Sequence, residues 1–148
     1  MVGKNSFKLF EDPLFNPLYQ QAQQRFHHTL AQMGADPALR FQLEGSVNIT
    51  DVGGYNQHHG HAQNMLSGCY YVRVPEHSGG IEFHEPRLGA KYSPFQPKSL
   101  YGSQSLVVQP QEGQLIIFPC WLEHSVQENL SSQSRYSIPM NLKPRQLV

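Results

Sequence analysis

Residues 135–142 read Arg-Tyr-Ser-Ile-Pro-Met-Asn-Leu, and the stretch alternates between two kinds of side chain. Successive side chains of an extended strand point to opposite faces. One face would carry the apolar residues Tyr136, Ile138, Met140 and Leu142. The other, mostly polar face would carry Arg135, Ser137, Pro139 and Asn141. The alternation therefore predicts a strand with one face packed in a core.

Short extended runs separated by turn residues fill the chain from Pro37 onward. The other predicted strands are residues 41–50, 65–74, 80–84, 105–109, 114–118 and 124–128. Seven strands in about 100 residues predict a mainly β fold, either a sandwich or an open barrel. Residues 87–103, with two glycines and two prolines, are expected to form a long loop of the kind that often binds ligands.

The N-terminal part has a different pattern. Between residues 12 and 33 apolar side chains recur every three or four positions, which predicts an amphipathic helix. Asp12 before Pro13 provides a cap and a first helical residue, and Gly34 suits the C-terminal end. Because a lone helix cannot bury its apolar stripe, we expect it to pack on the sheet. All 148 residues are expected to form one domain, with a helical segment at 1–40 and a β core at 41–148.

Charge and composition exclude several classes of partner. Eleven Lys and Arg residues balance eleven Asp and Glu residues, so no broad electrostatic attraction to nucleic acid or to an anionic membrane is expected. The sequence shows neither a membrane-spanning apolar stretch nor a signal peptide, which favours a soluble, cytoplasmic protein. Cys69 and Cys120 lie in apolar runs and are expected to be buried, reduced thiols. The oligomeric state stays open, a homodimer included.

Histidines are unusually frequent, and three of the eight fall within residues 56–61, Asn-Gln-His-His-Gly-His. If this stretch is extended, His59 and His61 project to one face and can bind one metal ion. His124, at the start of a later predicted strand, could be a third ligand. Three protein ligands would leave coordination positions open for substrate, cofactor or oxygen. The alternative is that these are exposed loop histidines without a metal.

Arg135 is the second candidate for a functional role. An arginine that points into a barrel needs an anion, because an unpaired buried charge costs several kcal/mol. Alternatively, Arg135 lies at the mouth of the barrel and pairs with a carboxylate or with water.

Five blocks of sequence carry a resemblance to a known family. They are residues 56–61, 66–72 (Leu-Ser-Gly-Cys-Tyr-Tyr-Val), 83–87 (Phe-His-Glu-Pro-Arg), 118–126 (Phe-Pro-Cys-Trp-Leu-Glu-His-Ser-Val) and 135–141. Their order and spacing, over about residues 47–142, resemble the 2-oxoglutarate/Fe(II)-dependent oxygenases of bacteria and phages. The resemblance implies a double-stranded β-helix, a jelly-roll barrel that holds iron near its open end.

The resemblance also implies a set of metal ligands. His59 and His61 resemble the proximal pair of the iron triad, and His124 resembles the distal ligand. His61 stands where the wider superfamily has Asp or Glu, so Fe(II), three neutral imidazoles and dianionic 2-oxoglutarate would sum to zero charge. Glu85 is a less favoured source of a carboxylate, and His58, with the opposite strand parity, is expected at the rim.

Other matching positions concern the cosubstrate. Arg135 resembles the arginine that binds the distal carboxylate of 2-oxoglutarate, Ser137 completes an Arg-x-Ser arrangement, and Tyr71 resembles a tyrosine that shares the carboxylate. The implied reaction uses Fe(II), 2-oxoglutarate and O2, releases succinate and CO2, and hydroxylates a small molecule or protein that the sequence does not identify. Two alternatives remain: a cupin-like three-histidine dioxygenase without 2-oxoglutarate, and a non-catalytic, metal-binding interaction module.

Overall fold

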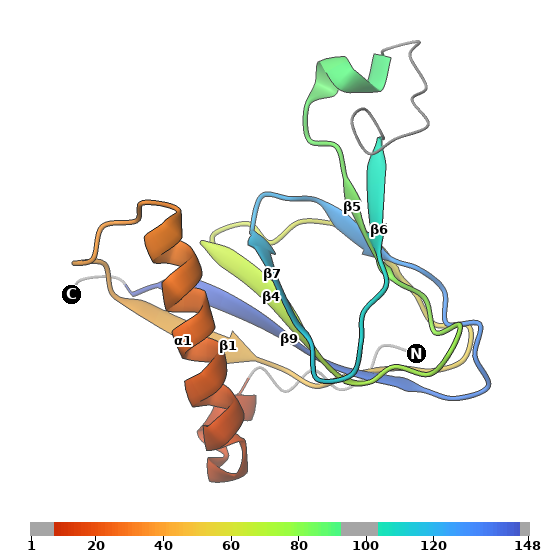
Figure 1. Cartoon of the computed structure of the whole chain (residues 1–148), viewed down its shortest axis with the longest axis horizontal. Coiled ribbons are helices and arrows are strands. Elements are labelled where there is room, and N and C mark those ends of the chain that lie inside the picture. Colours follow the sequence, from red (N-terminus) through yellow and green to blue (C-terminus); the bar gives the residue numbers. More distant parts are fainter. Residues whose placement is uncertain (1–7, 93–103, 146–148) are drawn as a thin grey trace.

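The structure is a computed structural model that describes residues 8–92 and 104–145, and in them two antiparallel sheets face each other (Figure 1). The larger sheet has the order β1-β9-β4-β7, with β2 also paired to β9. Its strands are β1 (Phe41–Gly45), β2 (Asn48–Thr50), β4 (Leu66–Arg73), β7 (Leu115–Pro119) and β9 (Arg135–Pro144). The smaller sheet, in the order β3-β8-β5-β6, contains β3 (Asn56–His59), β5 (Ile81–His84), β6 (Ser105–Val108) and β8 (His124–Val126). The predicted mainly β fold is confirmed.

The helical segments are η1 (Leu9–Glu11), η2 (Pro13–Phe15), α1 (Asn16–Gln32) and η3 (Leu88–Tyr92). The helix predicted from the apolar repeat is therefore present, but its first turn is a separate 3-10 turn. The Asp12 side chain accepts a hydrogen bond from the Leu14 N–H at 2.9 Å, so it caps η2 and not α1. Gly34 follows α1 with a φ of +77°, a conformation that glycine adopts without strain.

No helix within the described ranges is both long and apolar enough to cross a lipid bilayer.

Helix α1 lies across the outer face of the larger sheet, as expected (Figure 1). The fully buried Phe26 ring lies over Gly68 at the centre of β4. A Cβ atom at Gly68 would come within 2.8 Å of both Phe26 Cζ and the Ile116 carbonyl oxygen, so the close approach of helix and sheet requires glycine there. Burial of the Phe26 side chain contributes about 2 kcal/mol to this packing.

The strand predicted at residues 41–50 is divided into β1 and β2. The interruption lies where β9 carries Pro139, which has no N–H to donate to a neighbouring strand. The Ser46 N–H instead donates to the Pro139 carbonyl at 3.1 Å. One proline thus turns an expected continuous strand into two short ones.

Strands β5 and β6 form a ribbon that projects beyond the rest of the barrel (Figure 1). Part of the long loop predicted at residues 87–103 follows β5, and its first residues form η3. Residues 93–103 of that predicted loop lie outside the described residues.

Candidate metal centre and adjoining cavity

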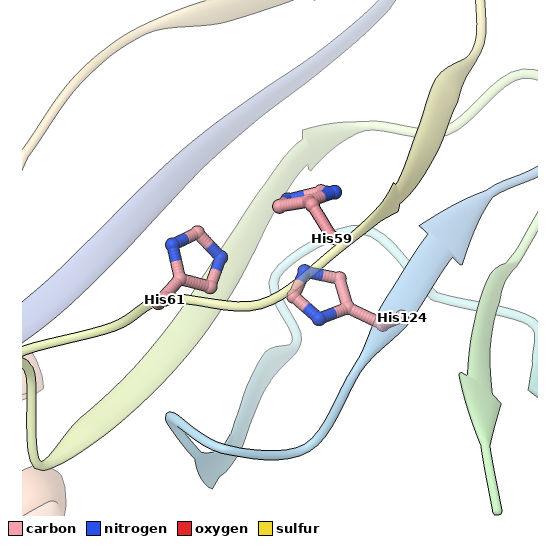
Figure 2. Close-up of side chains that lie close together, drawn as sticks. All are labelled: His59, His61 and His124. Carbon is pink, nitrogen blue, oxygen red and sulfur yellow. The ribbon is translucent and has the colours of Figure 1, made fainter.

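Three histidine side chains converge at the end of the smaller sheet. His59, the last residue of β3, lies directly opposite His124, the first residue of β8. Figure 2 shows both rings together with that of His61, and the ring centroids are 4.4 to 5.1 Å apart. One ring nitrogen from each histidine lies within 4.8 Å of those of the other two. Such a cluster can hold a single metal ion.

His61 reaches the cluster by a different route from the one predicted. Strand β3 ends at His59, so His61 does not share a face with it through strand alternation. The His61 N–H donates to the Cys120 carbonyl at 3.1 Å, which holds this segment against the turn between β7 and β8. The predicted residues are brought together, but through a contact between distant segments.

Backbone carbonyl groups orient two of the imidazole rings. His59 Nδ1 lies 2.7 Å from the Gln57 carbonyl oxygen, and His124 Nδ1 lies 3.1 Å from the Leu122 carbonyl oxygen. Because a carbonyl oxygen can only accept, Nδ1 carries a proton in both rings, and in the neutral tautomer Nε2 has the lone pair. This arrangement prepares Nε2 of both rings to bind a metal.

Burial also keeps two of the imidazoles, those of His61 and His124, uncharged. The His124 side chain is 4% exposed, and this burial lowers its pKa to about 4. Burial, followed by the proximity of His59, lowers the pKa of His61 below its usual value. These two histidines are therefore neutral near pH 7, as metal ligands must be. Among the described residues no carboxylate joins the cluster, and Glu85 forms a two-point contact with Arg87 instead.

A cavity of about 360 Å³ adjoins the histidines and lies between the two sheets. It is lined by the three histidines and by Ser46, Asn48, Asn56, Gly68, Cys69, Tyr71, Ile81, Phe118, Val126, Arg135, Ser137, Pro139 and Asn141. The polar face predicted for residues 135–142 thus points into the cavity. The apolar Ile138, Met140 and Leu142 lie in the core on the helix side.

Arg135 is 2% exposed and lies at the cavity wall. Its Nη1 donates to the carbonyl oxygens of Ser78 at 2.6 Å and Gly79 at 2.9 Å. Its Nη2 makes a long contact of 3.4 Å to Thr50 Oγ1, and its buried Nε has no partner within the described residues. The ion pairs of residues 8–92 and 104–145 do not include Arg135. A buried guanidinium with an unused N–H is suited to an anion in the cavity.

Tyr71 and Ser137 lie directly opposite each other on β4 and β9, both buried beside Arg135. Burial raises the pKa of Tyr71 above its usual value, so its hydroxyl stays protonated and can donate. Cys69 shares this wall, and burial raises the pKa of its thiol to about 11. The sequence interpretation treated Cys69 only as a buried thiol, although it has the same strand parity as Tyr71. Both cysteines are free, as predicted, but each is only partly buried.

His58 lies outside the cluster of three histidines. Its Nε2 is 2.7 Å from Glu123 Oε2, and its ring stacks on His84 with centroids 4.1 Å apart. His84 Nε2 is 2.9 Å from Ser125 Oγ. The rim position predicted for His58 from its strand parity agrees with these contacts.

A family model described as "Putative 2OG-Fe(II) oxygenase" matches residues 47–141. The chain belongs to this family. The family is one of oxidoreductases that use Fe(II), 2-oxoglutarate and O2. Comparison with curated proteins gives no match.

Solved structures of other oxygenases share the fold. A prolyl-4-hydroxylase from Pseudomonas putida is 19% identical, with a TM-score of 0.61. The match covers 86% of this chain and 65% of the hydroxylase chain. An oxidoreductase of the 2OG-Fe(II) oxygenase family from Burkholderia pseudomallei is 15% identical, with a TM-score of 0.56. This match covers 72% of this chain and 46% of the oxidoreductase chain. The chain thus spans less than two thirds of either structure. The likeness confirms the double-stranded β-helix, or jelly roll.

Proposed function

We propose that this family member is an Fe(II)- and 2-oxoglutarate-dependent dioxygenase that hydroxylates a substrate and releases succinate and CO2. The observation that carries the proposal is that the three-histidine cluster and Arg135, with its unused Nε, line the same cavity. Membership of the family supports the choice of metal and cosubstrate.

The donor set is compatible with Fe(II). Imidazole nitrogen suits iron, and the three ligands would be His59, His61 and His124. Neutral imidazoles leave the full charge of the ion uncompensated, so the dianion of 2-oxoglutarate would balance it. When bound, iron and 2-oxoglutarate supply the electrons that reduce O2, while the protein orients and shields them.

Arg135, Ser137 and Tyr71 are proposed to bind the distal carboxylate. The carbonyl groups of Ser78 and Gly79 fix Nη1 of Arg135, so the guanidinium is held in place before the ligand arrives. Its Nε is then free to donate, and the hydroxyls of Tyr71 and Ser137 add neutral donors from the same wall. Hydrogen bonds from a charged donor to a carboxylate are stronger than those between neutral groups.

Aromatic rings cover one side of the centre. The Phe118 ring lies 4.7 Å from that of His124 and 5.0 Å from that of Phe83, and it excludes water from this side. His59, in contrast, is exposed. A small molecule or a protein side chain would therefore reach the metal from the side of His59.

Anaerobic addition of 2-oxoglutarate to the Fe(II) protein tests the proposal. We expect a visible metal-to-ligand charge-transfer band, followed by succinate formation when air is admitted. A cupin-like three-histidine dioxygenase would give no band with 2-oxoglutarate, and would consume O2 only with its own substrate. A non-catalytic metal-binding module would bind the metal and form no succinate.

A further inference from the structure

Asn141 lies at the other end of the cavity-facing row of β9 from Arg135. They are six positions apart, which corresponds to about 20 Å along an extended strand. Ser67, the neighbour of Asn141 on β4, is also the direct partner of Phe118 on β7. Since the Phe118 ring packs against His124, Asn141 belongs to the histidine end of the cavity.

A buried hydroxyl sets the orientation of the Asn141 side chain. Ser67 is 1% exposed, and its Oγ donates to Asn141 Oδ1 at 2.8 Å. This bond uses the amide oxygen of Asn141 and turns its NH2 group away from Ser67. The NH2 group makes no hydrogen bond to the described part of the chain, so two oriented donors remain for a ligand.

The other amides of the cavity are placed differently. Asn48 lies opposite Ser137, at the level of the proposed distal carboxylate site. Asn56 is exposed and lies opposite Val126. Of the described residues that line the cavity, Arg135 alone carries a permanent charge, and it lies at the far end. The histidine end therefore has Asn141 as its oriented amide donor.

We propose that Asn141 Nδ2 donates to the carboxylate of 2-oxoglutarate that lies next to the metal, and that Ser67 is the positioning residue that aims it. This inference rests on the proposed function. A carboxylate held by a metal at the histidines would have a second oxygen to satisfy, and a hydrogen-bond donor at this end of the cavity would serve it. The NH2 group of Asn141 has the right polarity for it.

A second hollow, lined by Glu44, Ala62, Gln63, Asn64, Asn141, Lys143 and Pro144, borders the other side of Asn141. The amide could therefore contact the oxidised substrate instead of the cosubstrate. The two assignments differ in which ligand loses affinity when Asn141 is changed.

Two ligands separate these assignments. 2-Oxobutyrate has the same 2-oxo acid head as 2-oxoglutarate but no distal carboxylate. Dissociation constants of both are measured with the anaerobic Fe(II) protein and by calorimetry with the Ni(II) protein. We expect Asn141→Ala to raise the dissociation constants of both ligands by the same factor, roughly ten- to hundredfold. Arg135→Ala should weaken 2-oxoglutarate alone.

Further variants keep the test independent of folding. Asn141→Asp retains the shape and the contact with Ser67 but replaces donors with a negative oxygen, so it should weaken both ligands more than alanine does. Ser67→Ala should lower the affinity for both 2-oxo acids in the otherwise native protein. It should have no further effect on either affinity when combined with Asn141→Ala. A merely structural role of Ser67 would give equal losses in the two backgrounds. Thermal unfolding confirms that each variant is folded.

Unchanged affinities for both ligands in folded Asn141→Ala and Asn141→Asp would overturn the inference. A loss for 2-oxoglutarate without a loss for 2-oxobutyrate would also overturn it, because the amide would then act at the distal end. These results leave the proposed function intact. Failure of the native protein to bind 2-oxoglutarate would overturn the proposed function itself.

Discussion

Replacing Arg135 with lysine keeps the charge but removes the planar guanidinium, one edge of which binds backbone carbonyls while another N–H is left for a ligand. Nη1 is bound to the carbonyls of Ser78 and Gly79, and Nε is unused. A lysine ammonium that satisfies both carbonyls has one donor left, so one of the two N–H groups available to a carboxylate, Nε and Nη2, is lost. A charge-assisted hydrogen bond contributes about 1.5–3 kcal/mol, so Arg135→Lys should raise the dissociation constant of 2-oxoglutarate at least roughly tenfold. Arg135→Ala, which loses both contacts, should raise it more than about a hundredfold.

The assay is a titration of the anaerobic Fe(II) protein with 2-oxoglutarate, followed by the charge-transfer band. Metal affinity is measured separately by competition with a chelator, and it should not change, because Arg135 makes no contact with the three histidines among its hydrogen bonds. Arg73→Lys is the matched control. Arg73 is exposed, lies over the Tyr136 ring at 5.9 Å, and does not line the cavity, so this variant should bind 2-oxoglutarate as the native protein does.

Two results would refute the reasoning about Arg135. Native affinity for 2-oxoglutarate in the folded Arg135→Lys and Arg135→Ala variants would show that the guanidinium does not bind the diacid. Equal losses of metal and 2-oxoglutarate affinity would show that Arg135 acts on the whole site and not on one ligand.

Three other predictions concern the metal, the core and a thiol. His124→Ala should lower Ni(II) affinity at least roughly a hundredfold, whereas the neighbouring His58→Ala should leave it near native, as measured by calorimetry; equal losses would contradict the ligand assignment. Gly68→Ala should destabilise the fold by about 1–3 kcal/mol in urea unfolding because of its contact with the helix, and Gly89→Ala, with no atom near its Cβ position, should not. Cys69 should resist a thiol reagent at pH 8 until the protein unfolds, because a thiol with a pKa of about 11 is only roughly one part in a thousand thiolate. Rapid labelling of native Cys69, detected by mass spectrometry, would contradict the low reactivity expected from its raised pKa.

The parts of the fold that sequence predicts well are those that depend on local periodicity. Alternation in residues 135–142 placed Arg135 and Ser137 on the cavity face and Met140 in the core, because a strand buried on one side has a period of two. The helix was recognised for the same reason, with a period of 3.6. Pro139, which cannot donate to a neighbouring strand, is also a local signal, and it accounts for the break between β1 and β2.

The site depends more on contacts between distant segments. His61 is placed by the Cys120 carbonyl, and Asn141 is oriented by Ser67, 74 residues away in sequence. Spacing along the chain does not contain these partners, because they follow from strand order and register. The partners of the Arg135 guanidinium, in the turn before β5, were unpredictable for the same reason.

The distribution of charge in the proposed site favours a diacid over a monoacid. Neutral His61 and His124 leave the charge of a bound metal at one end of the cavity, and buried Arg135 places a permanent charge at the other. A monoanion would leave one of these positive centres without a counter-charge, which is unfavourable at the buried Arg135 guanidinium. A diacid with carboxylates at its two ends compensates both. The replacement of a carboxylate ligand by His61 therefore strengthens the requirement for a doubly charged cosubstrate, because all the negative charge near the metal must come from the ligand.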